Sequence, residues 1–550
     1  MKPTSFILAL GALAATACSQ RPAVEADYAV VPLPADIQLA DGAAPFRLNP
    51  DTRIVAADSA DAANAAFLAE YIGDLTGFTP GITATAPAKD YIRIATAPGG
   101  TPDSYTITAN ADSMVVAGAD AAGAFYGIQT IRKAIPAEAD GHDVLFPAAT
   151  VTDAPRFAYR GTHLDCARHF FGADSVKQFI DILALHNINR LHWHLTDDQG
   201  WRIEIKSRPR LTEVGSMRPQ TVIGVNTGVY DSIPHGGFYT QEQIRDIVDY
   251  AAARHIEVIP EVDLPGHMLA ALASYPELGC TGGPYDVWQI WGVSKDVLCA
   301  GNDSVYAFLD DVMAEVTDLF PSELIHIGGD ECPKNRWKEC PKCQARIRAL
   351  GLRSDANSSA EEKLQSHIMG HVTDFLAERG RRVIGWDEML QGGATDNAVI
   401  MSWRGANGAV AAARAGHDAI IVPFKYLYFD FAQSTEPGEP AGAHWSTPVL
   451  IDSVYAYEPM PAELTADEQK HIIGVQANLW SEFIPTYSHM EYMALPRMAA
   501  LSELQWSAAP KDYDAFTGRL RRLARHYDAA GYNYAAHTIP ADTTRQEANR

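Results

Sequence analysis

Strand-like runs alternate with helix-like runs from about residue 156 to residue 480, and this alternation constrains the fold more than any other feature of the chain. The strand candidates are residues 159–165, 188–196, 256–262, 324–328, 383–386, 399–403, 418–428 and 473–480. Amphipathic stretches lie between most of them, as at 175–187, where apolar residues recur near helical spacing. Eight such βα units predict an α/β fold of the (β/α)8 barrel type.

Residues 28–153 have a different pattern and are predicted to form a small α+β accessory domain. Strand candidates lie at 91–95, 105–108 and 113–117, with Ala-rich helical stretches at 60–77 and 121–135. The turn at 152–155 is a plausible hinge. The barrel domain is then expected over 154–536, closed by helices at 490–507 and 513–530 and followed by a tail at 537–550.

The N-terminus carries an export signal. Residues 1–17 hold Lys2 and an apolar run of 13 residues, which suits a signal peptide and is too short to span a bilayer. The run ends in Ala-Thr-Ala-Cys, which resembles a lipobox with Cys18 as the lipidated residue, and residues 18–27 would be a tether. We expect a bacterial cell-envelope protein, with lipid-free secretion as the alternative; the membrane would be contacted only through such an anchor.

The charge of the chain excludes some partners. Among 550 residues, 44 Lys and Arg against 68 Asp and Glu give a net charge of −24. Electrostatic binding to nucleic acid or to an anionic lipid surface is therefore not expected. The net charge does not exclude the binding of neutral ligands such as sugars.

Export makes disulfides possible. A bridge between Cys280 and Cys299 would close a 20-residue loop and stabilise the fold by roughly 3 kcal/mol. Cys332, Cys340 and Cys343 form a second cluster with metal-ligand spacing. A closed zinc site needs four ligands and only three are recognisable here, so one disulfide plus a free thiol is the favoured interpretation.

Reactive side chains follow the predicted strands at the point where each strand ends, which is where a (β/α)8 barrel carries its active site. In chain order they are Arg168, Asp197, Glu261, Asp263, His267, Asp330, Glu331, Trp386, Trp403, Tyr428, Asp430, Trp480 and Glu482. Indole faces stack on the apolar faces of sugar rings, while carboxylates and Arg bind hydroxyls. The mixture predicts a carbohydrate pocket.

The motifs around these residues resemble glycoside hydrolase family 20, the β-N-acetylhexosaminidases. The barrel motifs are PRFAYRGTHLDCARHF, LHWHLTDDQGWR, PEVDLPGH, HIGGDE, GWDE and MSWRG, and GADAAGAFYGIQT resembles the N-terminal accessory domain of the family. The resemblance covers nearly the whole mature chain. It implies an exo-acting, retaining enzyme that removes terminal β-linked GlcNAc or GalNAc and uses no cofactor or metal.

The resemblance also implies roles in catalysis. Glu331 matches the general acid/base, and we expect Asp330, other carboxylates and Trp walls to raise its pKa. In this family the substrate's 2-acetamido oxygen attacks C1 and gives an oxazolinium ion, so no second carboxylate serves as nucleophile. Asp330 would orient the acetamido N–H, and Tyr428 would hydrogen-bond the acetamido oxygen. Asp197 and His267 match a relay that supports Glu331.

The remaining matched residues would bind the sugar. Trp386, Trp403 and Trp480 match the pocket walls that enclose the ring and the acetamido methyl. The residues matched to the grip on the hydroxyls of the terminal sugar are Arg168, Asp430 and Glu482. Whether Trp288, Trp291 or Trp445 reaches the pocket is left open.

Three alternatives deserve comparison. A metal-dependent barrel hydrolase would use His192 and His194 with Asp197, but the later strands lack further His ligands. A sugar-binding protein on the same scaffold would have no need of Glu331 beside Asp330. A conventional two-carboxylate glycosidase would act on sugars that lack the 2-acetamido group.

Overall fold

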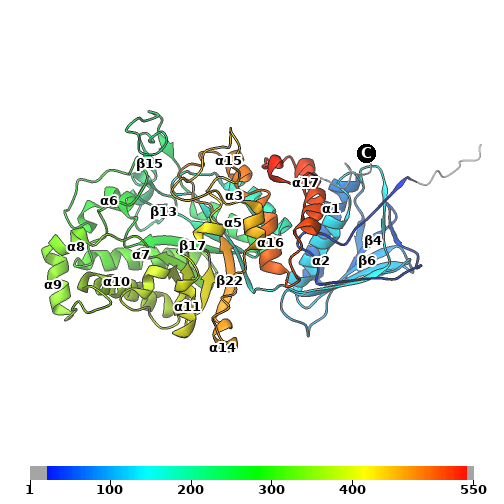
Figure 1. Ribbon diagram of the computed structural model, residues 1–550, viewed down its shortest axis with the longest axis horizontal. Helices are drawn as coiled ribbons and strands as arrows, with labels where there is room; N and C mark the ends of the chain where they lie inside the picture. The colour runs from blue at the N-terminus through cyan, green and yellow to red at the C-terminus, as the bar shows by residue number, and fades with distance from the viewer. Residues whose placement is uncertain (1–20, 542–550) are drawn as a thin grey trace, which may run out of the picture.

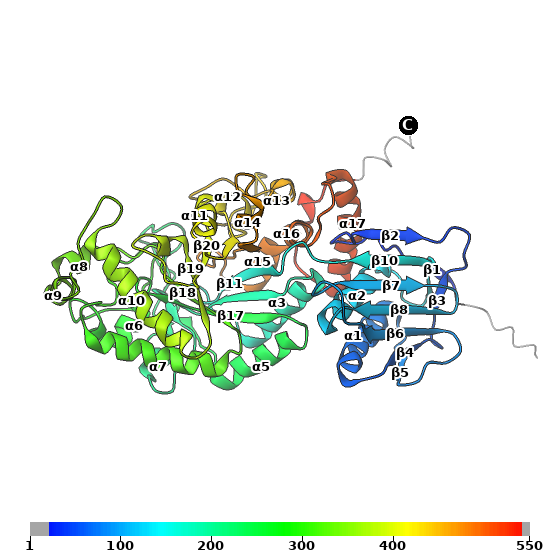
Figure 2. The same cartoon turned by 90° about the horizontal axis from the view of Figure 1, so that it is seen from below.

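Eight parallel strands close into a barrel in the computed structural model, which describes residues 21–541 (Figures 1 and 2). The strands, in barrel order, are β11 (Tyr159–Asp165), β12 (Arg190–His194), β17 (Glu257–Leu264), β18 (Leu324–Gly328), β19 (Arg382–Trp386), β20 (Val399–Ser402), β21 (Ala419–Ile421) and β22 (Ile472–Ala477). Strand β22 pairs with β11 and completes the circle. The predicted (β/α)8 fold is confirmed.

Helices surround the barrel and connect its strands. The longer ones are α3 (Ala173–Leu185), α5 (Gln241–Ala252), α7 (Asp303–Leu319), α10 (Ala360–Ala377), α11 (Asn407–Arg414), α15 (Tyr487–Ala494), α16 (Arg497–Trp506) and α17 (Tyr513–Ala530). Helix α10 begins at a capping box, in which Ser359 and Glu362 satisfy each other's backbone N–H groups. Helix α5 begins in the same way with Thr240 and Gln243.

Shorter elements lie in the connections. Helix α9 (Pro341–Ala349) is a further helix of nine residues. The helical turns are α4 (Arg210–Glu213), α6 (Leu269–Ser274), η1 (Pro276–Leu278), α8 (Asn335–Glu339), η2 (Asp387–Leu390), α12 (Phe424–Leu427), α13 (Ile451–Ala456), α14 (Ala466–Gln469) and η3 (Ala536–Thr538). The short strands are β13 (Thr196–Asp197), β14 (Gly200–Trp201), β15 (Met217–Arg218) and β16 (His235–Gly236).

Proline explains two departures from the predicted elements. The seventh strand was predicted to run to residue 428, but it ends at Ile421 because Pro423, which has no N–H for a ladder, begins the helical turn α12. Tyr428 rejoins the sheet only through an isolated bridge to Asn478. The predicted helix at 490–507 is two helices, α15 and α16, with Pro496 between them.

The N-terminal domain is built on a mixed seven-stranded sheet. Its order is β2 (Asp36–Leu39), β10 (Ala149–Asp153), β7 (Tyr105–Ala109), β8 (Ser113–Gly118), β6 (Tyr91–Thr96), β4 (Arg53–Ala56) and β5 (Gly81–Thr83). Helices α1 (Ser59–Thr76) and α2 (Ala121–Ala134) pack on each other and on this sheet. A smaller sheet joins β1 (Ala23–Glu25), β9 (Asp143–Phe146) and β3 (Phe46–Leu48).

The chain is already ordered inside the expected tether. Residues 23–25 form β1 and pair in parallel with β9, so the N-terminal domain includes part of the segment assigned to the tether. The predicted signal peptide and the lipidation candidate Cys18 lie outside the described residues. Within residues 21–541, no helix combines the length and the apolar character that a bilayer span requires.

The two domains meet over buried charged groups. Arg160 on β11 is fully buried, donates to Asp103 at 2.9 Å, and packs against the rings of both Tyr126 and Trp506. Helix α17 lies beside the N-terminal domain in both ribbon views (Figures 1 and 2), and Arg525 on α17 pairs with Glu138. The N-terminal domain is therefore fastened to the barrel by specific polar contacts as well as by apolar packing.

Candidate active site

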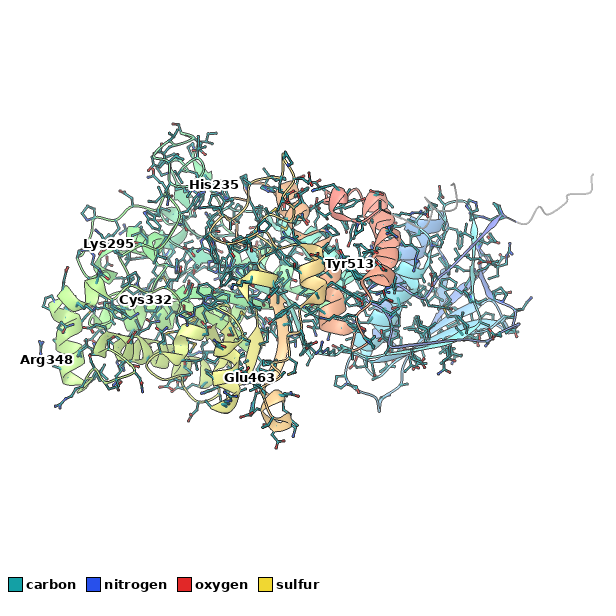
Figure 3. The ribbon with its side chains drawn as sticks, viewed as in Figure 1. His235, Lys295, Cys332, Arg348, Glu463 and Tyr513 are labelled. Atoms are coloured by element: carbon teal, nitrogen blue, oxygen red, sulfur yellow. The ribbon has the colours of Figure 1, made fainter. Side chains whose placement is uncertain are left out.

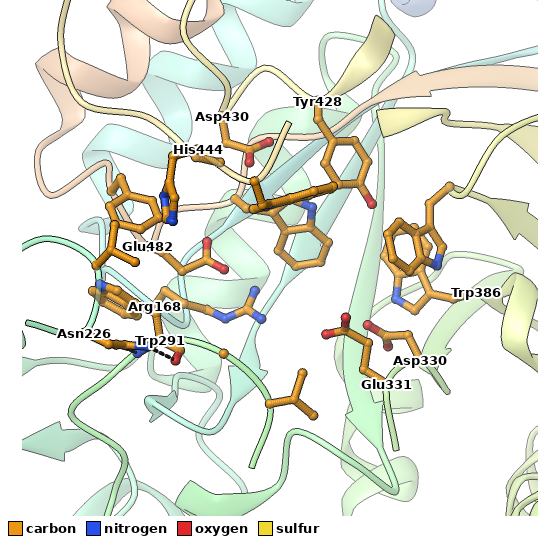
Figure 4. Close-up of a pocket in the computed structure, with 18 residues that line it drawn as sticks. Arg168, Asn226, Trp291, Asp330, Glu331, Trp386, Tyr428, Asp430, His444 and Glu482 are labelled. Atoms are coloured by element: carbon orange, nitrogen blue, oxygen red, sulfur yellow. Dashed lines mark hydrogen bonds between the residues drawn. The ribbon is translucent and has the colours of Figure 1, made fainter. Parts of the chain in front are cut away.

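A pocket with a volume of about 390 Å³ opens where the barrel strands end (Figure 4). Nine of the predicted site residues line it: Arg168, Asp330, Glu331, Trp386, Trp403, Tyr428, Asp430, Trp480 and Glu482. They come from six strand ends that are far apart in sequence. Asp197 and His267, the predicted relay residues, are buried and do not line the pocket.

The turn after β18 presents the two neighbouring carboxylates. Gly328 has φ of +65°, and a Cβ there would lie 1.6 Å from Asp263 Oδ1, so only glycine fits. Glu331 itself has φ of +43°, in the left-handed region that costs a side-chain-bearing residue of order 1–3 kcal/mol. Such strain, maintained by tight surroundings, is typical of a functional turn.

Asp330 is buried, and its surroundings disfavour ionisation. Burial raises its pKa to about 6, helped by the charge of Glu331 and opposed by His267. Its Oδ1 atom has no hydrogen-bond partner among the described residues. Asp330 thus offers a buried acceptor to whatever occupies the pocket.

The pKa of Glu331 was expected to be raised by its neighbours, but in the structure it is lowered. Its side chain is 43% exposed, and its Oε2 lies 3.6 Å from His267 Nε2. The nearby positive charge of that imidazolium holds the pKa of Glu331 below its usual value. The sequence-based expectation is wrong for the free pocket because it counted only carboxylates and apolar walls.

His267 is cationic because of the residues behind it. Burial alone would lower its pKa, but Asp197 outweighs burial and holds that pKa well above its usual value. Asp197 Oδ1 lies 3.1 Å from His267 Nδ1, and Asp197 Oδ2 lies 2.8 Å from Arg168. This arrangement brings the predicted relay residues together.

A larger buried network is centred on Glu261, which the sequence placed at the end of the third strand without assigning it a role. Glu261 on β17 is inaccessible to solvent and lies within 3.0 Å of His192, His194 and His326. One ring nitrogen of His194 hydrogen-bonds Glu261 and the other hydrogen-bonds Asp197, so both nitrogens already have a carboxylate partner. His192 and His194, the pair considered for a metal-dependent hydrolase, therefore serve this carboxylate–imidazole network.

Three charged groups line the opposite side of the pocket. Burial raises the pKa of Asp430, and the charge of Glu482 raises it further. Burial also raises the pKa of Glu482, although the neighbouring Arg168 opposes this shift. Asp430 Oδ1 and Arg168 Nε have no hydrogen-bond partner among the described residues. Because unpaired buried polar atoms are costly, these groups are suited to binding the hydroxyls of a ligand.

Indole rings form the pocket walls and are fixed from behind. Trp386 Nε1 donates to Glu261 and Trp403 Nε1 donates to Glu388, each at 3.1 Å. Trp480 lies under the Arg168 guanidinium, 4.8 Å from ring centroid to Cζ, and 5.8 Å from the Trp386 ring. With the N–H groups of Trp386 and Trp403 satisfied, these two rings are free to present apolar faces to the cavity.

The segment that carries Tyr428 and Asp430 is irregular but firmly held. Arg497, fully buried at the start of α16, donates to the carbonyls of Phe429 and Phe431. It also donates to the carbonyls of Val449 and Met493. These bonds give an irregular segment a defined position beside the pocket.

Some lining residues were not predicted. Asn226 exchanges two hydrogen bonds with the backbone of Trp291, and both line the pocket with His444 and Trp445 (Figure 4). Trp288 is partly buried against the core and is not among the described lining residues. Of the three tryptophans left open, Trp291 and Trp445 reach the pocket. Long connections without periodicity supply this rim, which is why no sequence pattern indicated it.

A (β/α)8 barrel with neighbouring carboxylates at one strand end and tryptophan walls around them defines a carbohydrate-active hydrolase. A profile described as "Glycosyl hydrolase family 20, catalytic domain" matches residues 157–509, and one described as "domain 2" of that family matches residues 27–154. The chain belongs to glycosyl hydrolase family 20. The resemblance inferred from the motifs is confirmed.

Named relatives agree with this assignment. The chain is 45% identical over 451 residues to a beta-hexosaminidase of Porphyromonas gingivalis, covering 81% of this chain and 56% of the relative. It is 41% identical over 366 residues to a beta-hexosaminidase of Vibrio furnissii, covering 66% and 59%. The chain thus spans less than two thirds of the length of either relative.

A solved structure extends the likeness to three dimensions. The exo beta-N-acetylglucosaminidase of Vibrio harveyi, in complex with N-acetylglucosamine, superposes with a TM-score of 0.81 at 33% identity. The match covers 94% of this chain and 80% of that one. Both domains are therefore arranged as in a family member.

Proposed function

We propose that this protein is an exo-β-N-acetylhexosaminidase that removes terminal β-linked GlcNAc or GalNAc with retention of anomeric configuration. The observation that carries the proposal is Asp330, a mostly buried carboxylate beside Glu331 with an enclosed oxygen free to accept a hydrogen bond. Family membership and the relatives named above supply the substrate class.

In the proposed reaction the substrate provides its own nucleophile. Asp330 accepts the acetamido N–H and stabilises the positive charge that develops as the acetamido oxygen attacks C1. Tyr428, whose hydroxyl faces the same side of the pocket, donates to that oxygen (Figure 4). Trp386, Trp403 and Trp480 keep the acetamido methyl and the ring in place. Water then opens the oxazolinium ion.

Glu331 would transfer the proton in both steps. In the free pocket His267 favours its ionised form. A sugar that covers the 43% exposed side chain removes water from the carboxylate, and desolvation raises the pKa of a carboxyl group. Binding of the substrate therefore prepares Glu331 to protonate the leaving oxygen, and His267 assists its return to the base form.

The discriminating experiment compares an aryl β-N-acetylglucosaminide with the corresponding aryl β-glucoside, with the product anomers followed by NMR. We expect hydrolysis of the first alone and initial release of the β-anomer. Equal rates on both sugars would overturn the acetamido mechanism and favour a conventional two-carboxylate glycosidase. Inversion would overturn retention.

The role of Glu331 is tested by Glu331→Gln, which cannot donate or accept a proton. We expect a loss of roughly 10²–10⁴-fold in kcat/KM on chito-oligosaccharides, whose leaving groups need protonation. The loss should be smaller on an aryl glycoside with an acidic leaving group. Equal losses on both substrates would contradict general-acid catalysis by Glu331.

A further inference from the structure

We propose that Cys280, Cys299, Cys340 and Cys343 form a structural zinc site that fastens the loop after β17 to helix α9. The four sulfur atoms lie within 4.8 Å of one another. The expected disulfide between Cys280 and Cys299 is absent, since both are free thiols in the structure. Sequence spacing grouped Cys332 with Cys340 and Cys343, whereas the fold joins Cys340 and Cys343 to Cys280 and Cys299. This inference does not depend on the proposed activity.

The spacing of the sulfurs matches a tetrahedral metal. The distances are 3.9 Å for Cys280–Cys343, 3.7 Å for Cys299–Cys340 and 3.6 Å for Cys299–Cys343. Zinc binds thiolate at about 2.3 Å, so the sulfurs of a regular tetrahedron lie about 3.8 Å apart. Tetrahedral coordination by four sulfurs selects zinc or iron, and zinc is the ion of closed structural sites.

The backbone brings the two cysteine pairs together. A bridge between Gly279 and Leu298 places Cys280 beside Cys299, and the Cys299 N–H donates to the Leu278 carbonyl at 2.8 Å. Cys340 precedes Pro341, the first residue of α9, and Cys343 lies in the first turn of that helix. Each pair is thus held by local structure before any metal binds.

Close contact between the backbones sets the distance between the pairs. A Cβ on Gly301 would lie 2.3 Å from the backbone nitrogen of Cys343 and 2.2 Å from the carbonyl carbon of Lys342. Only glycine allows the loop to approach α9 so closely.

The surroundings suit a cluster with a net negative charge. Four thiolates and one Zn²⁺ carry a charge of −2, and their binding releases the four thiol protons. The first turn of α9, which carries Cys343, provides positive backbone potential. Cys299, Cys340 and Cys343 are buried and Cys280 is half-buried, so water has little access to the site.

The site would stabilise part of the pocket rim. The loop between Cys280 and Cys299 carries Trp291 and Val293, which line the pocket, while α8 and α9 follow the turn that carries Glu331. Lys295 of this loop and Arg348 of α9 both lie in the end of the barrel away from the N-terminal domain (Figure 3). A metal here joins the loops after β17 and β18, outside the reacting groups.

The first test measures metal in the full chain purified without added metal or chelator. We expect one zinc per chain by elemental analysis. Replacement with Co²⁺ should give the strong visible bands and the thiolate charge-transfer band of tetrahedral cobalt thiolate. Absence of zinc together with two disulfides, seen as a loss of four titratable thiols, would overturn the proposal, and so would stoichiometric iron.

The second test uses matched variants. We expect Cys343→Ser, with three thiolates left, to lose most of the zinc and to lower the melting temperature, whereas Cys332→Ser, a buried cysteine outside the set, retains one zinc. If Cys343→Ser does not fold, the cobalt spectrum of the wild-type chain still decides the question. Full zinc content in Cys343→Ser, or its loss in Cys332→Ser, would contradict the assignment of the ligands.

Discussion

Asp153 and Asp330 lie in different parts of the molecule. Removal from water raises the pKa of both carboxyl groups, but their hydrogen-bond partners differ. Burial raises the pKa of Asp153, at the domain interface, and of Asp330, in the pocket, to about 6. Asp153 accepts four hydrogen bonds, from Tyr105, Trp506 and the backbone of Ala35 and Ala154. One oxygen of Asp330 accepts none among the described residues. A shifted pKa alone therefore does not identify a functional carboxylate, whereas an unsatisfied oxygen facing a cavity does.

Of the three tests of this comparison, Asp330→Asn should produce the largest effect. The amide cannot stabilise the positive charge of the oxazolinium ion, so we expect kcat/KM to fall about 10²–10³-fold. The free energy of unfolding should stay the same or rise, because an amide is cheaper to bury than a carboxylate. Steady-state kinetics and thermal melting measure the two quantities. A full rate would remove Asp330 from the mechanism.

Asp153→Asn is the matched control, and we expect it to lower the stability of the fold while leaving the activity unchanged. Its amide NH2 would face backbone or indole N–H donors, so we expect a destabilisation of about 1–3 kcal/mol. Chemical denaturation should detect the loss, while kcat/KM of the folded fraction stays at the wild-type value. If Asp153→Asn lost activity and kept its stability, the contrast between the two sites would fail.

Lowering the pH should give the smallest of the three effects, measured as the decline of kcat/KM on the acid side of its pH profile. Asp330 must be ionised to stabilise a positive charge, and its pKa of about 6 means that it takes up a proton as the pH falls. We expect kcat/KM to decline below about pH 6, approaching tenfold per unit. Asp153→Asn should keep this limb, since Asp153 does not contact the pocket. A rate independent of pH from 4 to 7 would contradict the assignment.

The sequence was sufficient for features whose signals are local. The alternation of strand and helix patterns located the carboxyl ends of most barrel strands, and the family motifs marked the pocket residues near those ends. Tyr428 and Asp430 lie well beyond Ile421, where β21 ends, so their prediction rested on the family resemblance. Asp330 and Glu331 were found in this way. The two helices of the N-terminal domain were found equally directly, since their apolar residues are continuous in sequence.

Features that depend on contacts between distant segments were not predictable. Cys299 and Cys340 are 41 residues apart, and only the fold shows that they are neighbours. The lowered pKa of Glu331 requires a cationic His267, which in turn requires Asp197 from another strand. Asn226 and His444 lie in connections without periodicity, where no spacing rule relates a residue to the pocket.

The left-handed backbone of Glu331 has a consequence for engineering. Glycine or asparagine would relax that φ of +43° and return part of the roughly 1–3 kcal/mol stored in the turn. A library screened for heat resistance alone would thus enrich substitutions at this position that hydrolyse nothing. Directed evolution of this chain should therefore select for catalytic turnover in every round, because thermal stability and catalysis favour different residues at position 331.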